Sequence, residues 1–214
     1  MKISVLILTH NRPRLFERCI QSVFGAWHKH KVELEIIVNN DSNDISEQNC
    51  DGIPITYLYE RSQNLSDIYR LLYDKATKEY LYYLEDDDIM SENFFEELSQ
   101  YNEDVFYFNY IPHKMSHSFI KFFGYTTTHG TKTIAEFLSK YDSHHFQFCQ
   151  ICFKKKALDP NAFPTTNDLH NDYKIFSSLV GSFRAIPKCL YTQTTDGGDN
   201  ISFKALNKDP RWIS

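Results

Sequence analysis

The chain has 214 residues, the length of one domain that buries a sizeable core without disulfides or metals. It is 42% hydrophobic, 15% aromatic and 24% charged with only 7 Gly and 7 Pro, which excludes collagen-like, low-complexity and loop-dominated folds. Its formal net charge of −5 argues against a dedicated nucleic-acid-binding protein, because such domains are usually strongly basic.

Strands and helices are predicted to alternate through the first half of the chain. A continuous apolar run, typical of a strand buried on both faces of a parallel sheet, occupies residues 3–8. Further strands are predicted over residues 34–38, 55–59, 80–84 and 105–110. Helical spacing predicts a first helix capped by Asn11, a second that starts near Ser66, and a short third capped by Ser91. This order is that of βαβ units, so we predict an α/β fold with a mostly parallel sheet flanked by helices.

The second half of the chain is less regular. We predict helices over residues 134–141 and 171–180, and strands over 146–153, 183–186 and 190–194. No linker composition and no internal repeat separates the two halves. The sequence therefore predicts a single domain over residues 1–214.

The cysteines and the apolar segments bear on the compartment of the protein. Five cysteines, an odd number, in a chain without a secretory signal predict reduced thiols. Cys149 and Cys152 lack a second pair to complete a zinc site and lie in an apolar run, which favours buried thiols. No stretch approaches the roughly 20 apolar residues of a spanning helix. We therefore expect a cytoplasmic protein without a transmembrane segment.

Polar clusters follow three of the predicted strands directly. They are Thr9–Arg12, Asn39–Asp44 and Glu85–Asp88. In an open parallel sheet, ligands bind in the crevice outside the carboxyl ends of the strands, so these clusters are expected to line one crevice. The sequence therefore predicts a site for a nucleotide or a sugar phosphate.

The run Glu85–Asp88 places four carboxylates next to one another after an apolar strand. Adjacent carboxylates repel one another unless a cation joins them, and oxygen ligands suit Mg²⁺ or Mn²⁺. The alternative is a solvated acidic loop that favours the N-terminus of the next helix. Its position at the end of a buried strand, beside two other polar strand ends, favours a metal site.

The three polar strand ends and two later segments follow an order typical of one protein family. The segments are SVLILTHNR at 4–12, EIIVNNDSND at 35–44, EYLYYLEDDD at 79–88, NDYKI at 171–175, and LY at 190–191 with DNIS at 199–202. Together they resemble the family-two glycosyltransferases with the GT-A fold, from about residue 3 to about residue 202. The resemblance implies a nucleotide-sugar-binding half over residues 1–110 and an acceptor-binding half over residues 111–214.

The resemblance also implies roles for individual residues. The implied nucleotide-sugar-binding residues are Thr9, His10, Asn11, Arg12, Asn39, Asn40, Arg61 and Asp86. Asp87 would bind Mn²⁺ or Mg²⁺ directly, with Asp88 beside it as a second metal ligand. Asp172 would be the catalytic base that takes the proton from the acceptor hydroxyl, with Asp168 and His170 as alternatives.

The sequence departs from the family pattern at several positions. Asn39 and Asn40 stand where the family usually has aspartate. An amide both donates and accepts hydrogen bonds, so these residues can still recognise uridine by hydrogen bonding. Glu85 stands at the first position of the acidic motif and shifts its carboxylate by one methylene. Ser66 and Arg70 stand where the family usually has Gly and Asn, and Arg70 is either a donor-phosphate contact or a surface arginine.

The implied reaction is an inverting, metal-dependent transfer of a sugar from a nucleoside diphosphate sugar, in the main hypothesis a UDP-sugar, to a hydroxyl group. The expected acceptor is a surface glycan or a lipid-linked sugar, and a modified base of viral DNA is the alternative. Two other functions stay open, a sugar-phosphate nucleotidyltransferase and a non-catalytic nucleotide-sugar-binding protein. A nucleotidyltransferase would need a Gly-rich, basic loop after the first strand, where this chain has only Arg12 and Arg14.

Overall fold

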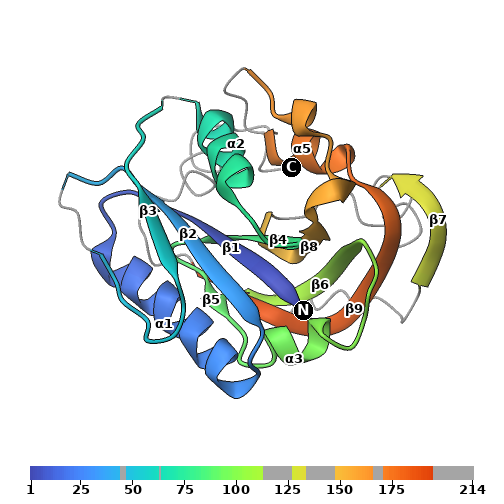
Figure 1. Cartoon of the computed structure of the whole chain (residues 1–214), viewed down its shortest axis with the longest axis horizontal. Coiled ribbons are helices and arrows are strands. Elements are labelled where there is room, and N and C mark those ends of the chain that lie inside the picture. Colours follow the sequence, from blue (N-terminus) through green and yellow to red (C-terminus); the bar gives the residue numbers. More distant parts are fainter. Residues whose placement is uncertain (44–46, 63, 113–126, 134–147, 166–170, 195–214) are drawn as a thin grey trace, which may run out of the picture.

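The computed structural model describes residues 1–43, 47–62, 64–112, 127–133, 148–165 and 171–194, which form an α/β fold around one mixed sheet (Figure 1). In the first half of the chain the elements are β1 (Lys2–Thr9), α1 (Pro13–Lys29), β2 (Glu33–Asn40), β3 (Ile55–Leu58), α2 (Leu65–Lys75), β4 (Tyr80–Glu85), β5 (Ile89–Met90), α3 (Phe94–Leu98) and β6 (Val105–Pro112). In the second half they are β7 (Thr127–Thr133), η1 (Phe148–Gln150), β8 (Ile151–Lys154), η2 (Lys155–Ala157), η3 (Pro160–Ala162), α5 (Asn171–Ser177) and β9 (Val180–Gln193).

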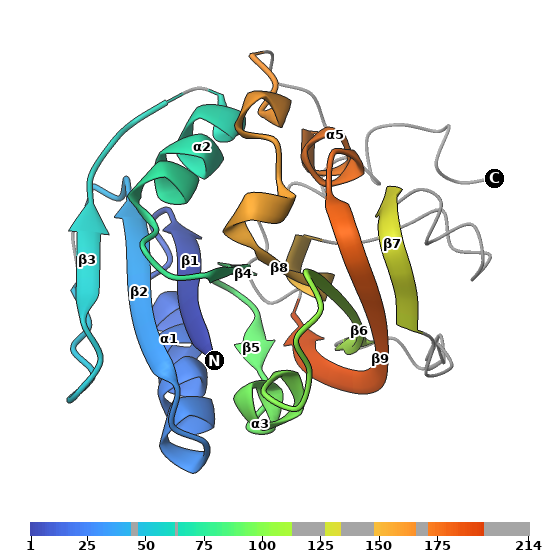
Figure 2. The same ribbon diagram turned by 45° about the vertical axis from the view of Figure 1, so that its right-hand side comes forward.

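The front of the sheet is parallel, as predicted. β1 lies between β2 and β4 and is parallel to both, while β3 continues the sheet beyond β2 (Figure 2). The register pairs Leu8 with Asn39 on one side and with Glu85 on the other. The carboxyl ends of β1, β2 and β4 therefore lie level at one edge of the sheet.

The rear of the sheet is mixed. β8 lies between β4 and β6 and is antiparallel to both. β9 is parallel to β6 and antiparallel to β5 and β7. The sheet order is β3-β2-β1-β4-β8-β6-β9-β5, so strands from the second half of the chain stand among strands from the first half.

Both faces of the sheet are covered by helices, which explains the continuous apolar runs of its strands. Ile3, Val5 and Ile7 of β1 pack in one core cluster with α1 and α3, whereas Leu6 packs in the other cluster with α2 and α5. Figure 1 shows α1 and α3 on one side of the sheet and α2 and α5 on the other. Among the described helices, none combines the length and the apolar surface needed to cross a bilayer.

Two predicted helix caps are wrong by one or two residues. α1 begins at Pro13 with Arg12 at the cap position, and Asn11 instead adopts the left-handed backbone region at φ 54. There its N–H donates to Ser42 Oγ at 2.7 Å, so the strand-end loops determine its conformation. α3 begins at Phe94 rather than after Ser91. α2 begins close to the predicted position, with Asn64 accepting from the Ser66 N–H.

The rear strands differ from the prediction for a local reason. The two short strands expected over 183–186 and 190–194 form one strand, β9, which also takes Val180 from the predicted helix. Pro187 lies between the two predicted strands, but the pairing passes from Ile186 directly to Cys189, and this bulge accommodates the missing N–H. β8 begins only at Ile151, after a 3₁₀ turn.

Two further segments complete the comparison with the prediction. β7 was not predicted, because its sequence TTHGTKT lacks apolar alternation. The predicted helix over residues 134–141 lies outside the described residues. Cys149 and Cys152 are buried free thiols, as expected.

Gly181 at the start of β9 is predicted to be essential for stability. Its φ is +131°, and a Cβ there would lie 2.8 Å from the Cβ of Asp104. Asp104 Oδ2 accepts from both the N–H and the hydroxyl of Ser182, so it has little freedom to move. We expect Gly181→Ala to destabilise the fold by about 1–3 kcal/mol, measured by thermal or urea unfolding.

The matched control is Gly25→Ala, in the interior of α1, where nothing lies within 4 Å of the added Cβ. This helical substitution should be neutral or stabilising by up to about 1 kcal/mol. Equal unfolding midpoints for the two variants would contradict the steric argument.

Candidate active site

The three polar strand ends meet at one edge of the sheet, as the sequence predicted. Arg12, after β1, donates to Asp86, after β4, with 3.0 Å between Nη1 and Oδ1. Asn11 contacts the loop after β2 through Ser42 Oγ, and its own Oδ1 accepts from the Asn43 N–H at 2.9 Å. The parallel register thus joins loops that are far apart in the sequence.

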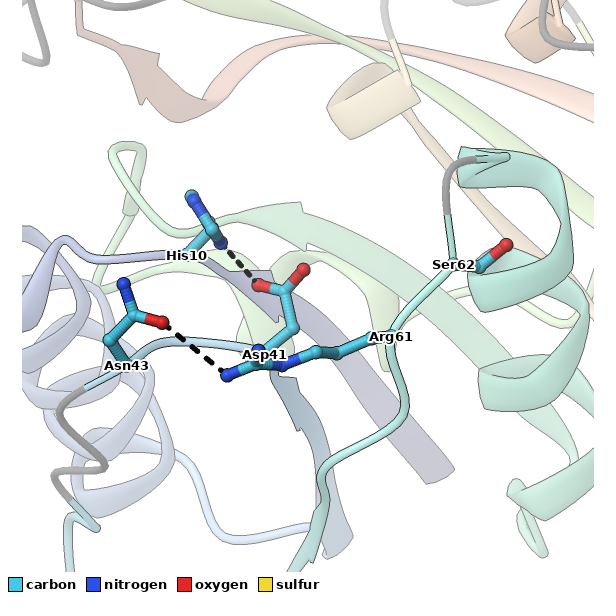
Figure 3. Close-up of a pocket in the computed structure, with 5 residues that line it drawn as sticks. All are labelled: His10, Asp41, Asn43, Arg61 and Ser62. Carbon is cyan, nitrogen blue, oxygen red and sulfur yellow. Dashed lines mark hydrogen bonds and ion pairs between the residues drawn. The ribbon is translucent and has the colours of Figure 1, made fainter.

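A cavity of about 360 Å³ opens between the loops that follow β1, β2 and β3. Its lining residues are His10, Asp41, Asn43, Arg61 and Ser62 (Figure 3). Two of them, His10 and Arg61, were predicted to bind a nucleotide sugar. The other three were not, although Asp41 and Asn43 belong to the polar cluster that the sequence marks after β2; nothing in the sequence marked Ser62.

The cavity presents both hydrogen-bond donors and acceptors. His10 Nδ1 lies 2.7 Å from Asp41 Oδ1, and Asn11 Nδ2 lies 2.9 Å from His10 Nε2. Because Asn11 donates to Nε2, the ring carries its proton on Nδ1 and donates it to Asp41. Arg61 Nη2 reaches Asn43 Oδ1 at 3.5 Å from the other side, as Figure 3 shows.

Asn39 and Asn40 lie beneath this cavity rather than in its lining. Asn39 exchanges two hydrogen bonds with the backbone of Glu60, at 3.0 and 3.1 Å, and only 2% of its surface is exposed. Asn40 Oδ1 accepts from the Ser42 N–H at 3.1 Å. Both amides hold the loops in place, and the side chains that face the cavity from this loop are those of Asp41 and Asn43.

The acidic run forms a tight turn between β4 and β5. Asp86, Asp87 and Asp88 are buried, whereas Glu85 is exposed. One carboxylate oxygen from each of Glu85, Asp87 and Asp88 lies within 4.8 Å of the others. The turn thus gathers negative charge in a largely buried place.

Two residues from distant parts of the chain hold the acidic turn. Arg18 of α1 donates to the carbonyl oxygen of Asp87 at 2.8 Å and to Thr194 Oγ1 at 2.9 Å. The N–H of Thr194 donates to Asp88 Oδ1 at 2.9 Å, and its hydroxyl donates to the Asp87 carbonyl. The end of β9 and the middle of α1 therefore fix the position of the turn.

The carboxyl groups of the turn resist ionisation. Burial raises the pKa of Asp86 to about 6, although Arg12 and Thr9 oppose the shift. Burial also raises the pKa of Asp88 to about 7. The turn therefore stabilises an added positive charge.

The donor set of the turn fits a hard divalent cation. All of its ligand atoms are carboxylate oxygens, which suit Mg²⁺ and Mn²⁺. In addition, Asp86 Oδ2 is buried without a hydrogen-bond partner among the described residues. Asp87 and Asp88, with Glu85, are the residues that would hold such an ion.

The predicted catalytic base is only partly described. Asp172 is the second residue of α5, a helix that packs through Ile175 and Phe176 against the face of the sheet opposite α1. The alternatives Asp168 and His170 lie outside the described residues. The role of Asp172 stays a prediction.

The fold is that of the GT-A glycosyltransferases. Three comparable structures are of S. aureus TarS, all at 15–16% sequence identity. The TM-scores are 0.70 for TarS 1-349 in complex with UDP-GlcNAc (94% of this chain and 61% of that chain), 0.66 for TarS 1-349 (91% and 60%) and 0.64 for TarS (100% and 41%). The chain thus spans about three fifths of the length of TarS 1-349.

The glycosyl transferase family 2 profile matches residues 4–160, which is most of the chain. No curated protein matches the sequence. The chain belongs to glycosyl transferase family 2, as the sequence segments predicted.

Proposed function

We propose that this glycosyltransferase moves a sugar from a UDP-sugar to the hydroxyl group of an acceptor, with inversion and with the help of Mn²⁺ or Mg²⁺. One observation carries the proposal, namely that the acidic turn and the polar cavity lie at the same edge of the sheet. A nucleotide can then occupy the cavity while its diphosphate reaches the acidic turn. The crystal structure of TarS with UDP-GlcNAc, which has a similar fold, supports a UDP-linked donor.

The cavity chemistry suits a uracil base. Uracil offers one N–H donor and two carbonyl acceptors on its edge. The Asp41 carboxylate supplies an acceptor for the N–H, and Arg61 supplies donors for a carbonyl oxygen. In this proposal Asn39 and Asn40 support the base-binding loop through their backbone contacts.

Asp86, Asp87 and Arg12 would serve the diphosphate end of the donor. A bound cation would offset the negative charge that grows on the leaving diphosphate. Asp87 and Asp88 would hold it. Arg12 and Thr9 orient Asp86 through hydrogen bonds, so that this carboxylate keeps one oxygen available in the site.

Asp172 would act as the general base. Its carboxylate would remove the proton from the acceptor hydroxyl as the oxygen attacks the anomeric carbon, and a single displacement inverts the configuration. The support for this role is the family match together with the position of Asp172 in the first turn of α5.

A surface glycan or a lipid-linked sugar is the proposed acceptor. The formal net charge of −5 disfavours a modified base in viral DNA, because a DNA duplex would be repelled. A sugar-phosphate nucleotidyltransferase is also disfavoured, since the loop after β1 contains no glycine and lacks the Gly-rich, basic sequence that such an enzyme needs.

The test is nucleoside diphosphate release from a panel of UDP-, GDP- and dTDP-sugars with Mn²⁺ and a set of glycan acceptors. We expect UDP release from one UDP-sugar, dependent on acceptor and abolished by EDTA. Pyrophosphate release from UTP and a sugar phosphate would instead indicate a nucleotidyltransferase. Donor binding without turnover on any acceptor would indicate a non-catalytic binding protein.

A further inference from the structure

Arg12 contacts two carboxylates of the acidic turn. Its Nη1 lies 3.0 Å from Asp86 Oδ1 and 3.4 Å from Asp87 Oδ2. The Arg12 side chain is 20% exposed, whereas those of Asp86 and Asp87 are 6% and 2% exposed. The guanidinium therefore partly neutralises the acidic turn from its open side.

This pairing conflicts with coordination of a cation by the same carboxylate. A divalent ion on Asp87 and a guanidinium 3.4 Å from one oxygen of that carboxylate would repel each other across a poorly solvated site. The contact of Arg12 with Asp86 is shorter than its contact with Asp87, so the contact with Asp87 breaks more easily.

We propose that Arg12 is an exchangeable counter-ion, which a divalent cation displaces from Asp87 and which then binds the diphosphate of the nucleotide. This inference rests on the proposed function. Arg12 stands at the N-cap of α1, where the backbone N–H groups also favour an anion. The diphosphate is negatively charged, like the carboxylate of Asp87. It can therefore replace Asp87 as a partner of the Arg12 guanidinium.

The exchange makes the cation and the nucleotide bind cooperatively. A cation alone replaces Arg12 at Asp87, while Arg12 keeps its contact with Asp86, and nothing compensates for the lost contact, so the cation binds weakly. When the diphosphate is present, it supplies a new contact for Arg12 and the cation binds more tightly. By thermodynamic linkage the cation must then tighten nucleotide binding by the same factor.

The experiment measures Mn²⁺ affinity by electron paramagnetic resonance, with and without UDP, for the wild type and three variants. Arg12→Gln should bind Mn²⁺ alone about tenfold more tightly than the wild type, because the competing charge is gone. UDP should then improve its Mn²⁺ affinity much less than it does for the wild type. Arg12→Lys, which keeps the charge, should bind Mn²⁺ alone as weakly as the wild type.

Arg14→Gln is the matched control, since Arg14 is an exposed arginine in the same turn of α1, and it should behave as the wild type. Unchanged or weaker Mn²⁺ binding by Arg12→Gln, or an undiminished effect of UDP, would overturn the exchange while leaving the proposed reaction intact. If the wild type turns over a UDP-sugar but binds no Mn²⁺ even with UDP, the metal part of the proposed function fails, and this inference fails with it.

Discussion

Asp87→Asn should lower kcat/KM for the UDP-sugar by at least about 100-fold at saturating Mn²⁺. Asp87 is 1% exposed, and one of its oxygens lies within 4.8 Å of carboxylate oxygens of Asp88 and Glu85, the other two residues that would hold the cation. The amide keeps the shape of the side chain but loses the negative charge that would hold the cation. Steady-state rates over a range of Mn²⁺ concentrations measure the effect.

Stability should not account for that loss. Removing one of four clustered carboxylates relieves repulsion among its neighbours but also removes the 3.4 Å contact with Arg12, which keeps its shorter contact with Asp86, so the melting temperature of Asp87→Asn should stay close to that of the wild type. The control is Asp74→Asn, which changes an exposed carboxylate paired with Arg70 on α2 and should leave the rates unchanged. Wild-type turnover by Asp87→Asn would refute the metal site.

Asp172→Asn should lower kcat by roughly 10²–10⁴-fold, the usual contribution of a general base. UDP and UDP-sugar binding should change little, because α5 packs on the face of the sheet opposite α1 and the cavity lining comes from the loops after β1, β2 and β3. Pre-steady-state rates combined with calorimetric titration of the donor separate the two effects.

The variant Asp168→Asn distinguishes between the two candidate general bases. Asp168→Asn should retain most of the activity if Asp172 is the base. A large loss in Asp168→Asn together with near-normal kcat in Asp172→Asn would transfer the role to Asp168. Loss of donor affinity in Asp172→Asn would indicate a binding role instead of proton transfer.

The front of the fold could be predicted because its strands are buried on both faces. In β1, Val5 and Leu6 pack in different clusters, so the strand is apolar on both faces and residues 5–8 form an unbroken apolar run. The convergence of the three polar strand ends followed from the parallel register alone. The rear could not be predicted as well, because the bulge around Pro187 keeps β9 continuous through a residue that normally ends strands.

The limits of the site prediction have a similar origin. Asn39 and Asn40 were expected to read the base because of their place in the motif, but motif position does not reveal which side chain of a loop turns inward. Asn39 bonds to Glu60, which is 21 residues away, and this contact exists only in the folded chain. Asp41 faces the cavity for the same reason, since His10 meets it from another strand end.

The contact of Thr194 with the acidic turn has a consequence for any attempt to dissect the enzyme. Thr194 and Arg18 both donate hydrogen bonds to the carbonyl oxygen of Asp87. β8 lies between β4 and β6 and pairs with both. A truncated piece that stops at residue 110 would keep every cavity residue and Arg18 yet lose Thr194 and β8. The position of the acidic turn therefore depends on the entire interleaved sheet, and a detached N-terminal piece would not preserve it.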